Sequence, residues 1–210
     1  MPFSEKVRVT HFGVFHQSKK VQGTTRAVEL KRYDGSLVIR FTRPEMRNPL
    51  SISVLGEVDK AFDDLADIEK VIFTGTDNVF ASGADLREIA SVNASDAREF
   101  ALRGQYLMDR IASLPQETIA AVNGYCFGGA LDLALACDRR IASPNATFAH
   151  PGASLGIITG WGGTQRLPRL VGTANALEMF FTASPIDADR ALQIGLVDVI
   201  ENDPLAAVLG

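Results

Sequence analysis

Short apolar runs alternate with segments of helical period along most of this chain, and this alternation restricts its fold more than any other feature. Residues 70–74 (KVIFT) and 118–122 (TIAAV) are apolar runs with the length of buried strands. Between and after them, apolar residues recur every three or four positions, as they do on one face of a helix. Strands that alternate with helices in this way predict an α/β fold.

The spacing of apolar residues also predicts where the individual strands and helices lie. Residues 27–32 and 36–42 flank the turn signal Tyr33-Asp34-Gly35 and predict a β-hairpin. An apolar stripe that begins at Ser51 predicts an amphipathic helix. Further helices are predicted over 96–113 and 128–137 and from about 163 and 173, with another strand over 139–142.

Length and composition indicate one globular domain. The chain has 210 residues, of which 46% are hydrophobic and 22% are charged, and it contains no repeat with a period of 20 to 50 residues. We expect residues 1–25 to be an N-terminal extension, 26–200 the folded core and 201–210 a short C-terminal tail. The extension is partly basic, because residues 1–32 carry seven basic and two acidic side chains. A solvated tail is the simplest interpretation of that charge.

Charge and cysteine content exclude several classes of protein. The net charge of −4 argues against binding to nucleic acid through a basic surface. Two cysteines, Cys126 and Cys137, are too few for a disulfide framework or a four-cysteine zinc site and fit a reducing compartment. No signal peptide and no membrane span is recognised in the sequence. We therefore expect a soluble cytoplasmic protein with no membrane partner.

Several catalytic motifs are also absent from the sequence. The glycines at 160–163 do not complete a dinucleotide-binding G-x-G-x-x-G pattern, because position 165 is Gln165, and no Walker lysine follows. The sequence has no G-x-S-x-G elbow of a serine hydrolase. The three histidines lack the spacing of metal ligands, so no metal site is expected.

The segment FASGADLREI, residues 80–89, predicts a helix start preceded by an accessible backbone amide. Asp85 and Glu88 have the spacing of a capping box, so the helix is expected to begin at Asp85. The N–H group of Ala84 then lies just before the helix and is free to donate. A plain helix start after a tight turn is the alternative interpretation of this pattern.

A second helix start follows the apolar run 118–122. Gly124, Gly128 and Gly129 lead directly into the helix predicted over 128–137, whose amino terminus attracts negative charge. The amides of Ala84 and Gly129 could converge on the oxygen of a thioester that becomes an enolate or a tetrahedral oxyanion. Asp132 lies on the same helical face one turn further on, where its carboxylate could act as a base. The alternative is that Asp132 merely complements the helix dipole.

Residues 148–172 form a glycine-rich stretch that we expect to be a loop shaping a pocket. It contains six glycines and two prolines among mostly apolar residues. Trp161 and His150 lie in this stretch and are candidates for lining an acyl pocket. Ordinary loop packing is the alternative interpretation for both side chains.

Four segments in order give the chain a resemblance to a known family. RPEMRNPLS (43–51), FASGADLREI (80–89), AAVNGYCFGGALDLALACD (120–138) and LGIITGWGGTQRLPRLVG (155–172) are similar to segments of the crotonase family, the enoyl-CoA hydratases and isomerases. The resemblance covers about residues 26–200. It implies a crotonase-like ββα spiral core that binds acyl-coenzyme A, and homotrimers or hexamers.

The resemblance also implies roles for individual residues. It assigns the oxyanion hole to the backbone amides of Ala84 and Gly129, the two positions reached above from the helix starts. It implies that the segment around Arg47, Asn48 and Leu50 lines coenzyme A. It implies no cofactor beyond the coenzyme A of the substrate. The other positions it assigns to substrate binding are Ser82, Asp85, Leu86, Gly128, Gly152 and Trp161.

The chain departs from the family pattern at the acid/base positions. Hydratases of the family use two glutamates, and this sequence has Asp132 at the first position and Gly152 at the second. Asp132 is therefore the only evident acid/base, and the helical region at the carboxyl end looks shortened. We expect an enzyme of the hydratase/isomerase type. The alternatives are a crotonase-type decarboxylase or thioester hydrolase, or a non-catalytic acyl-CoA-binding protein.

Overall fold

Six strands form the main sheet, in the order β1-β2-β4-β7-β9-β12. The computed structural model describes residues 26–210, and residues 1–25, where the N-terminal extension was predicted, lie outside the described part. β1 and β2 pair in antiparallel fashion, and the four pairings that follow are parallel. The strands of this sheet are β1 (Val28–Tyr33), β2 (Ser36–Phe41), β4 (Lys70–Thr74), β7 (Glu117–Val122), β9 (Arg139–Ala142) and β12 (Val199–Ile200).

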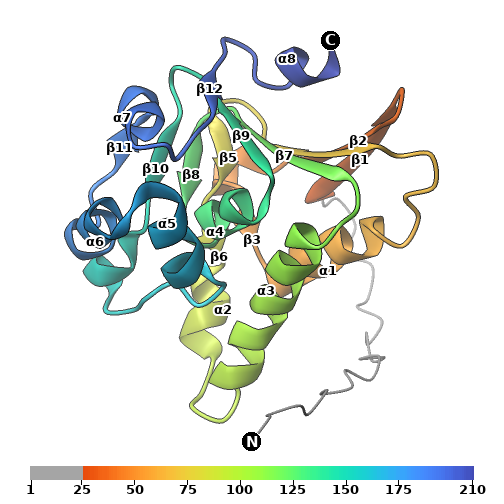
Figure 1. Ribbon diagram of the computed structural model, residues 1–210. Helices are drawn as coiled ribbons and strands as arrows, with labels where there is room; N and C mark the ends of the chain where they lie inside the picture. Colours follow the sequence, from red (N-terminus) through yellow and green to blue (C-terminus); the bar gives the residue numbers. More distant parts are fainter. Residues whose placement is uncertain (1–25) are drawn as a thin grey trace, which may run out of the picture.

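Alternate residues of these strands face two different apolar layers. On one face Ile39, Phe73 and Val122 belong to the large core formed with the helices. On the other face Val38 and Ile72 belong to a smaller cluster that packs against residues near the carboxyl end. Figure 1 shows α1 (Ile52–Ala61), α3 (Ala97–Ala112) and α4 (Gly129–Ala136) on the core side and α8 (Ala206–Leu209) near the opposite side of β12.

Two smaller sheets lie beside the main one and position the candidate site. A four-stranded sheet has the order β11-β10-β8-β5, and a two-stranded sheet consists of β3 and β6. Their strands are β3 (Pro49–Leu50), β5 (Val79–Ala81), β6 (Gly83–Ala84), β8 (Tyr125–Phe127), β10 (Thr147–Ala149) and β11 (Ile186–Asp187). The parallel pairing of β3 with β6 places Leu50 opposite Ala84.

The remaining helices connect and cover these sheets. α5 contacts both α4 and α6, which places the glycine-rich loop before α5 next to α4. These elements are η1 (Pro44–Met46), α2 (Leu86–Ser91), η2 (Pro151–Leu155), α5 (Gly163–Val171), α6 (Thr173–Thr182) and α7 (Ala188–Gln193). The fold is a mixed α/β architecture, as the alternation of periods predicts.

One local prediction was wrong and another was confirmed. Asp85 caps α2, since its carboxylate accepts a hydrogen bond from the backbone of Arg87. Glu88 does not complete a capping box, because its carboxylate instead accepts a 2.9 Å hydrogen bond from the backbone N–H of Ile52. Glu88 therefore ties α2 to the start of α1, a contact between residues far apart in the sequence.

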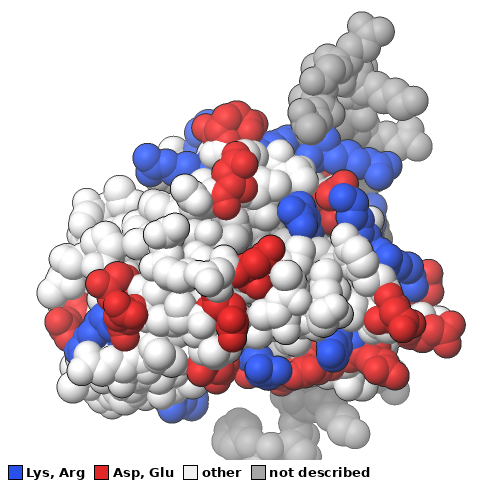
Figure 2. Space-filling view, turned by 90° about the horizontal axis from the view of Figure 1, so that it is seen from above, with Lys and Arg blue, Asp and Glu red and all other residues white. Residues whose placement is uncertain are grey.

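The described part of the chain has two further properties that bear on function. None of its helices has the length and apolar character needed to cross a bilayer, and none of its groups of histidine, cysteine or acidic residues could hold a metal ion. On the face drawn in Figure 2, acidic and basic side chains are interspersed around uncharged areas.

Candidate active site

The end of β6 meets the start of α4, and this junction forms the centre of the candidate site. Gly83 has φ +86°, and a Cβ atom at this position would lie 2.5 Å from the backbone nitrogen of Gly129 and 2.7 Å from the carbonyl oxygen of Phe127. Only glycine allows so close an approach. Seen from the other segment, a Cβ atom on Gly129 would lie 3.3 Å from the backbone nitrogen of Ala84. The structure therefore brings Ala84 and Gly129 together.

Separate elements position these two amides. Gly129 is the first residue of α4, so its N–H group has no acceptor within the helix. Gly128 precedes it with φ 55°, and no side chain caps the helix start. Ala84 is held independently by the ladder between β3 and β6. Two amides positioned by separate elements at a helix amino terminus suit an oxygen atom that carries negative charge.

Asp132 lies in α4 one turn beyond Gly129, with its side chain fully buried. The Thr159 hydroxyl donates a hydrogen bond to its Oδ2 atom. Burial raises the pKa of Asp132 to about 7, although Thr159 and the backbone amides of Trp161 and Gly163 favour the charged form and act in the opposite direction. A carboxyl group with a pKa near neutrality can both accept and release a proton.

His150 lies next to Asp132. Its Nε2 atom is 3.6 Å from Asp132 Oδ1, and its ring centroid is 5.1 Å from that of Phe180. Burial lowers the pKa of His150 to about 4, which keeps the imidazole neutral at physiological pH. Within residues 26–210, neither ring nitrogen nor Asp132 Oδ1 has a hydrogen-bond partner.

From the sequence, His150 is only a candidate for lining an acyl pocket, with ordinary loop packing as the alternative. The one signal available was its position directly after the apolar residues Phe148 and Ala149 and before Pro151. β10 ends at Ala149 and pairs with β8, which leads into α4. This pairing places His150 next to Asp132.

Gly152 lies in the tight η2 turn after His150. Its carbonyl oxygen accepts a 3.0 Å hydrogen bond from the backbone of Ile157, and a Cβ atom on Gly152 would lie 2.5 Å from the Ile157 carbonyl oxygen. A side chain at this position requires the turn to open. The position at which the family resemblance implies a second glutamate is thus closed to side chains in this backbone conformation.

Trp161 is buried, with 3% of its surface exposed. Its indole lies between α3 and α4, where a Cβ atom on either Gly104 or Gly129 would overlap the ring. Phe100 packs beside it, with 6.3 Å between ring centroids. The structure therefore places Trp161 against one of the two amide-bearing residues.

The 47–50 segment adjoins the centre of the site through β3, but two of its side chains serve the fold. Asn48 accepts a 2.6 Å hydrogen bond from the backbone of Arg43 and donates to the carbonyl oxygens of Val79 and Phe80. The Leu50 side chain is buried in the core. Arg47 is exposed, with φ 62° and its guanidinium 5.4 Å from the centroid of the Tyr125 ring.

The other positions predicted to bind substrate surround the junction of β6 and α4. The Ser82 carbonyl oxygen would lie 3.8 Å from a Cβ atom on Gly128, so these two residues are neighbours. The Asp85 carboxylate forms an ion pair with Arg87, with 2.6 Å between Oδ2 and Nη2, and Arg87 lowers the pKa of Asp85. Leu86 is more than half exposed.

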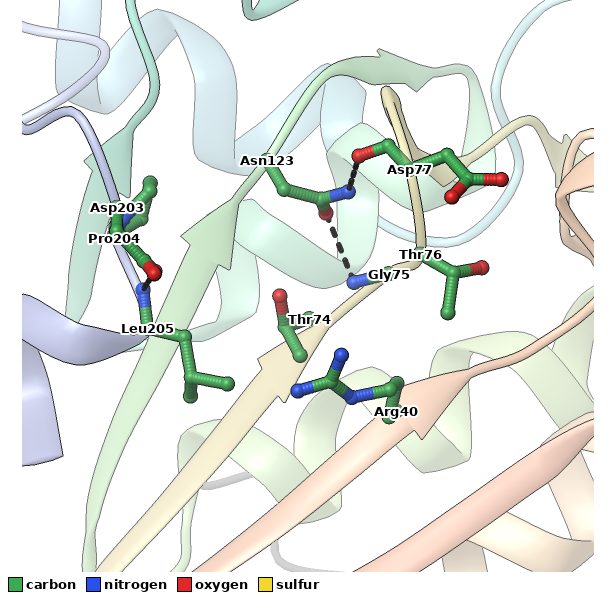
Figure 3. Close-up of a pocket in the computed structure, with 9 residues that line it drawn as sticks. All are labelled: Arg40, Thr74, Gly75, Thr76, Asp77, Asn123, Asp203, Pro204 and Leu205. Atoms are coloured by element: carbon green, nitrogen blue, oxygen red, sulfur yellow. Dashed lines mark hydrogen bonds between the residues drawn. The ribbon is translucent and has the colours of Figure 1, made fainter.

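A separate hollow of about 280 Å³ lies at the carboxyl end of β4 and shares no lining residue with the Asp132 region. In Figure 3 the Asn123 amide joins the backbone of Gly75 to that of Asp77, while Arg40 reaches toward Thr74. Arg40 Nε is buried without a hydrogen-bond partner in the described part of the chain. The amide of Asn123 is occupied by the fold, so this hollow offers little matched chemistry.

Comparisons with known proteins place this geometry in context. The family model described as enoyl-CoA hydratase/isomerase matches residues 31–208. Crotonyl-CoA hydratase of Syntrophomonas wolfei is 41% identical over 175 residues, which cover 81% of this chain and 67% of the relative. The short-chain-enoyl-CoA hydratase of Clostridium acetobutylicum is also 41% identical, over 78% of this chain and 64% of the relative.

Solved structures give the same result for the fold. The enoyl-CoA hydratase of Bacillus anthracis matches with a TM-score of 0.79 and 35% identity, over 84% of this chain and 70% of that one. The enoyl-CoA hydratase of Thermoplasma volcanium matches with a TM-score of 0.83 and 32% identity, over 88% and 75% of the two chains. The crotonase-like fold is confirmed. The chain spans about two thirds of the length of these two curated relatives.

Proposed function

Because the chain belongs to the enoyl-CoA hydratase/isomerase family, we propose that it binds an enoyl-coenzyme A thioester and hydrates its double bond, with Asp132 as the acid/base. The observation that carries this proposal is the close approach of Gly83 to the Gly129 amide, one helical turn before a buried carboxyl group. The names of the hydratase relatives support the class of reaction.

The backbone amides of Ala84 and Gly129 polarise the thioester carbonyl. When a nucleophile adds to C3 of the conjugated thioester, the electron pair of the double bond moves toward the carbonyl oxygen and creates an enolate. Two N–H donors directed at that oxygen stabilise the enolate more than the ground state. Loss of one such donor typically costs about 100-fold to 1,000-fold in rate.

Asp132 moves the proton in this scheme. Its carboxylate accepts a proton from water as the water oxygen bonds to C3, and the resulting carboxylic acid donates a proton to C2 as the enolate collapses to the thioester. A pKa of about 7 suits both steps. One carboxyl group therefore serves where related hydratases use two. The scheme needs no cofactor beyond the coenzyme A of the substrate.

Coenzyme A binding is proposed for the surface near β3. Arg47 is the exposed cation of the 47–50 segment and is suited to a phosphate of coenzyme A. Asn48 and Leu50 contribute by holding the backbone of this segment in place. Ser82, Asp85, Leu86 and Gly128 surround the thioester through the loop and helix starts that they form.

We further propose that copies of this chain associate, as homotrimers or hexamers, through an apolar patch formed by η2, the loop after it, and α6. The patch exposes Ile158 by 68% and Phe181 by 76%, with Leu155, Ile157 and Leu177 beside them. η2 and α6 contact each other, which supports treating these exposed apolar side chains as one patch. Exposed apolar patches of this kind mark protein–protein contacts.

A non-catalytic acyl-CoA-binding protein is the second candidate. It is favoured by one observation, since the position of the second glutamate is Gly152 in a turn that excludes side chains. Both candidates need the amide pair, but only the enzyme needs a titratable group at position 132. Asp132→Asn therefore distinguishes them.

The experiment follows the loss of conjugated-thioester absorbance with crotonyl-CoA for the wild type, Asp132→Asn and the surface control Asp63→Asn. We expect Asp132→Asn to lower kcat at least 100-fold without weakening crotonyl-CoA binding in calorimetry, and Asp63→Asn to match the wild type. Crotonyl-CoA binding by the wild type without turnover would instead favour the binding protein. No binding at all would reject both candidates.

A further inference from the structure

The indole of Trp161 fills the space beside the amide pair and is held there from both sides. Glycine lies where the ring meets α3, at Gly104, and where it meets α4, at Gly129. A methyl group at either position would overlap the ring. Two helices thus leave room for one large flat side chain beside Gly129.

The backbone around Trp161 is also anchored. Gln105 of α3 donates a 2.7 Å hydrogen bond to the carbonyl oxygen of Gly160, and Arg166 donates to that of Trp161. The amide of Trp161 faces the Asp132 carboxyl group. The indole is therefore positioned by the same loop that covers the proposed acid/base.

A pocket of about 400 Å³ lies beside Phe100, the ring that packs on the indole of Trp161. Phe100 lines this pocket with one part of its surface and packs on the indole with another. Ile52, Val92 and charged side chains of α3 form other parts of the lining. Phe100 is therefore the residue that links this pocket to the indole.

We infer that Trp161 is a specificity-determining residue that restricts the site to short, planar enoyl groups. This inference rests on the proposed function, because it assumes that a thioester oxygen sits on the amides of Ala84 and Gly129. An acyl chain that extends from this point meets the face of the indole after a few carbons. A conjugated crotonyl group is flat and can pack on the ring, whereas a long chain must displace it.

The test compares crotonyl-, octenoyl- and dodecenoyl-CoA as substrates of the wild type, Trp161→Ala and Trp161→Phe. We expect the wild-type kcat/KM to fall at least tenfold from crotonyl- to dodecenoyl-CoA. Trp161→Ala removes the ring that packs on Phe100, a residue of the 400 Å³ pocket, and should remove or reverse that preference. Trp161→Phe fills most of the space and should give an intermediate profile. Tyr106→Ala, which removes an exposed aromatic ring from α3, is the matched control and should keep the wild-type profile.

A second readout does not depend on turnover or on the folding of a variant. Trp161 is the only tryptophan in the sequence, so the intrinsic emission of the wild-type protein reports on this position alone. We expect crotonyl-CoA to change that emission and coenzyme A without an acyl group to leave it unchanged. An identical response to both would overturn the inference.

The outcomes separate this inference from the proposed function. If the wild type hydrates all three substrates equally well, or if Trp161→Ala folds and keeps the wild-type profile, Trp161 does not set specificity and the proposed function stands. If the wild type neither binds nor converts any of the three, the proposed function fails, and the inference fails with it.

Discussion

The amide pair and the acidic region beside it are neighbours in space but are built by different means. The amide pair consists only of backbone, and its geometry depends on the absence of a side chain at Gly83 and Gly129. The acidic region, by which we mean Asp132 and the neighbouring His150, consists of side chains. Its properties come from the burial of these two residues. The first matches the family pattern, whereas the second departs from it at both carboxylate positions.

This difference teaches which part of such a site tolerates change. A backbone donor cannot be exchanged for another chemical group, and its position is set by strands and helices that also form the core. A buried acid can be replaced by a shorter one, with solvent exclusion and neighbouring groups adjusting its pKa. The amide pair is therefore the more rigidly specified part of the candidate site.

The largest effect is expected from Gly83→Ala, which changes the geometry of the amide pair directly. A Cβ atom at this position lies 2.5 Å from the Gly129 nitrogen, so β6 and α4 must move apart. We expect crotonyl-CoA turnover to fall about 1,000-fold, the upper end for loss of an oxyanion donor. The measurement is the same absorbance assay.

Gly172→Ala is the matched control for this substitution. Gly172 has φ +80°, close to the +86° of Gly83, but nothing lies within 4 Å of its Cβ position. With ψ 157° it lies in a region that is open essentially to glycine, so alanine there is strained by about 1–3 kcal/mol, but without the collision. Equal losses of activity in the two variants would mean that backbone strain, and not the approach of β6 to α4, disturbs the site.

The acidic region is tested by the pH dependence of the free energy of unfolding. Asp132 has a folded pKa of about 7 against 3.8 in a model compound, so it destabilises the protein increasingly as pH rises through that interval. His150 has a folded pKa of about 4 against 6.5, so its contribution to stability increases with pH over that interval. The two slopes oppose each other, and wild-type stability should stay nearly flat between pH 4 and 6.5.

Single variants should tilt this profile in opposite directions. In His150→Gln only Asp132 of the pair still titrates, so the free energy of unfolding should fall by about 1.4 kcal/mol for each unit that the pH rises. In Asp132→Asn only His150 of the pair still titrates, so the free energy of unfolding should rise by about the same amount for each unit that the pH rises. Urea denaturation from pH 4 to 6.5 provides the measurement. Parallel profiles for the two variants would contradict the opposite pKa shifts of Asp132 and His150.

Gly152→Glu restores the second glutamate of the family pattern and tests whether its absence alone limits activity. The collision of its Cβ atom with the Ile157 carbonyl oxygen predicts a loss of stability of about 1–3 kcal/mol and no gain in crotonyl-CoA hydration. Thermal unfolding and the absorbance assay measure the two effects. A clear gain in kcat would show that the η2 turn opens easily and that the acidic region lacks only a carboxylate.

The smallest effect on the folded chain is expected from Phe181→Lys, which lies outside both regions. Phe181 is 76% exposed, so the stability of a single copy should change by less than about 0.5 kcal/mol. Its sedimentation mass should nevertheless fall from that of an oligomer to that of one chain. Leu30→Lys, at an exposed position on β1, is the control and should leave the mass unchanged. A wild-type protein that sediments as one chain would make the proposed oligomer wrong.

The sequence predicted the long elements and part of the site. Helices such as α3 and strands such as β4 have enough residues for their period to show, and their bounds agree with the structure within a few residues. The amides of Ala84 and Gly129 could be located because glycines and a capping aspartate mark helix starts. These signals are local, so the sequence carries them directly.

The rest depended on contacts between distant segments. β3 and β6 have two residues each, which is too short for any period, although they hold Ala84 in place. Glu88 was expected to cap its own helix, but Ile52 provides a backbone donor from another helix. The approach of His150 to Asp132 requires β10 to pair with β8, and nothing in the residues around His150 indicates that partner.

The short ladder between β3 and β6 has a consequence for folding. It joins Leu50 to Ala84, and Ala84 then meets the start of α4 at Gly129, so the site forms only after three distant parts of the chain have closed on one another. Contacts of such large sequence separation form slowly. A ligand that requires this junction binds the native chain but not partly folded forms, and it stabilises the native state by mass action. Crotonyl-CoA should therefore raise the melting temperature in proportion to the logarithm of its concentration once that exceeds Kd.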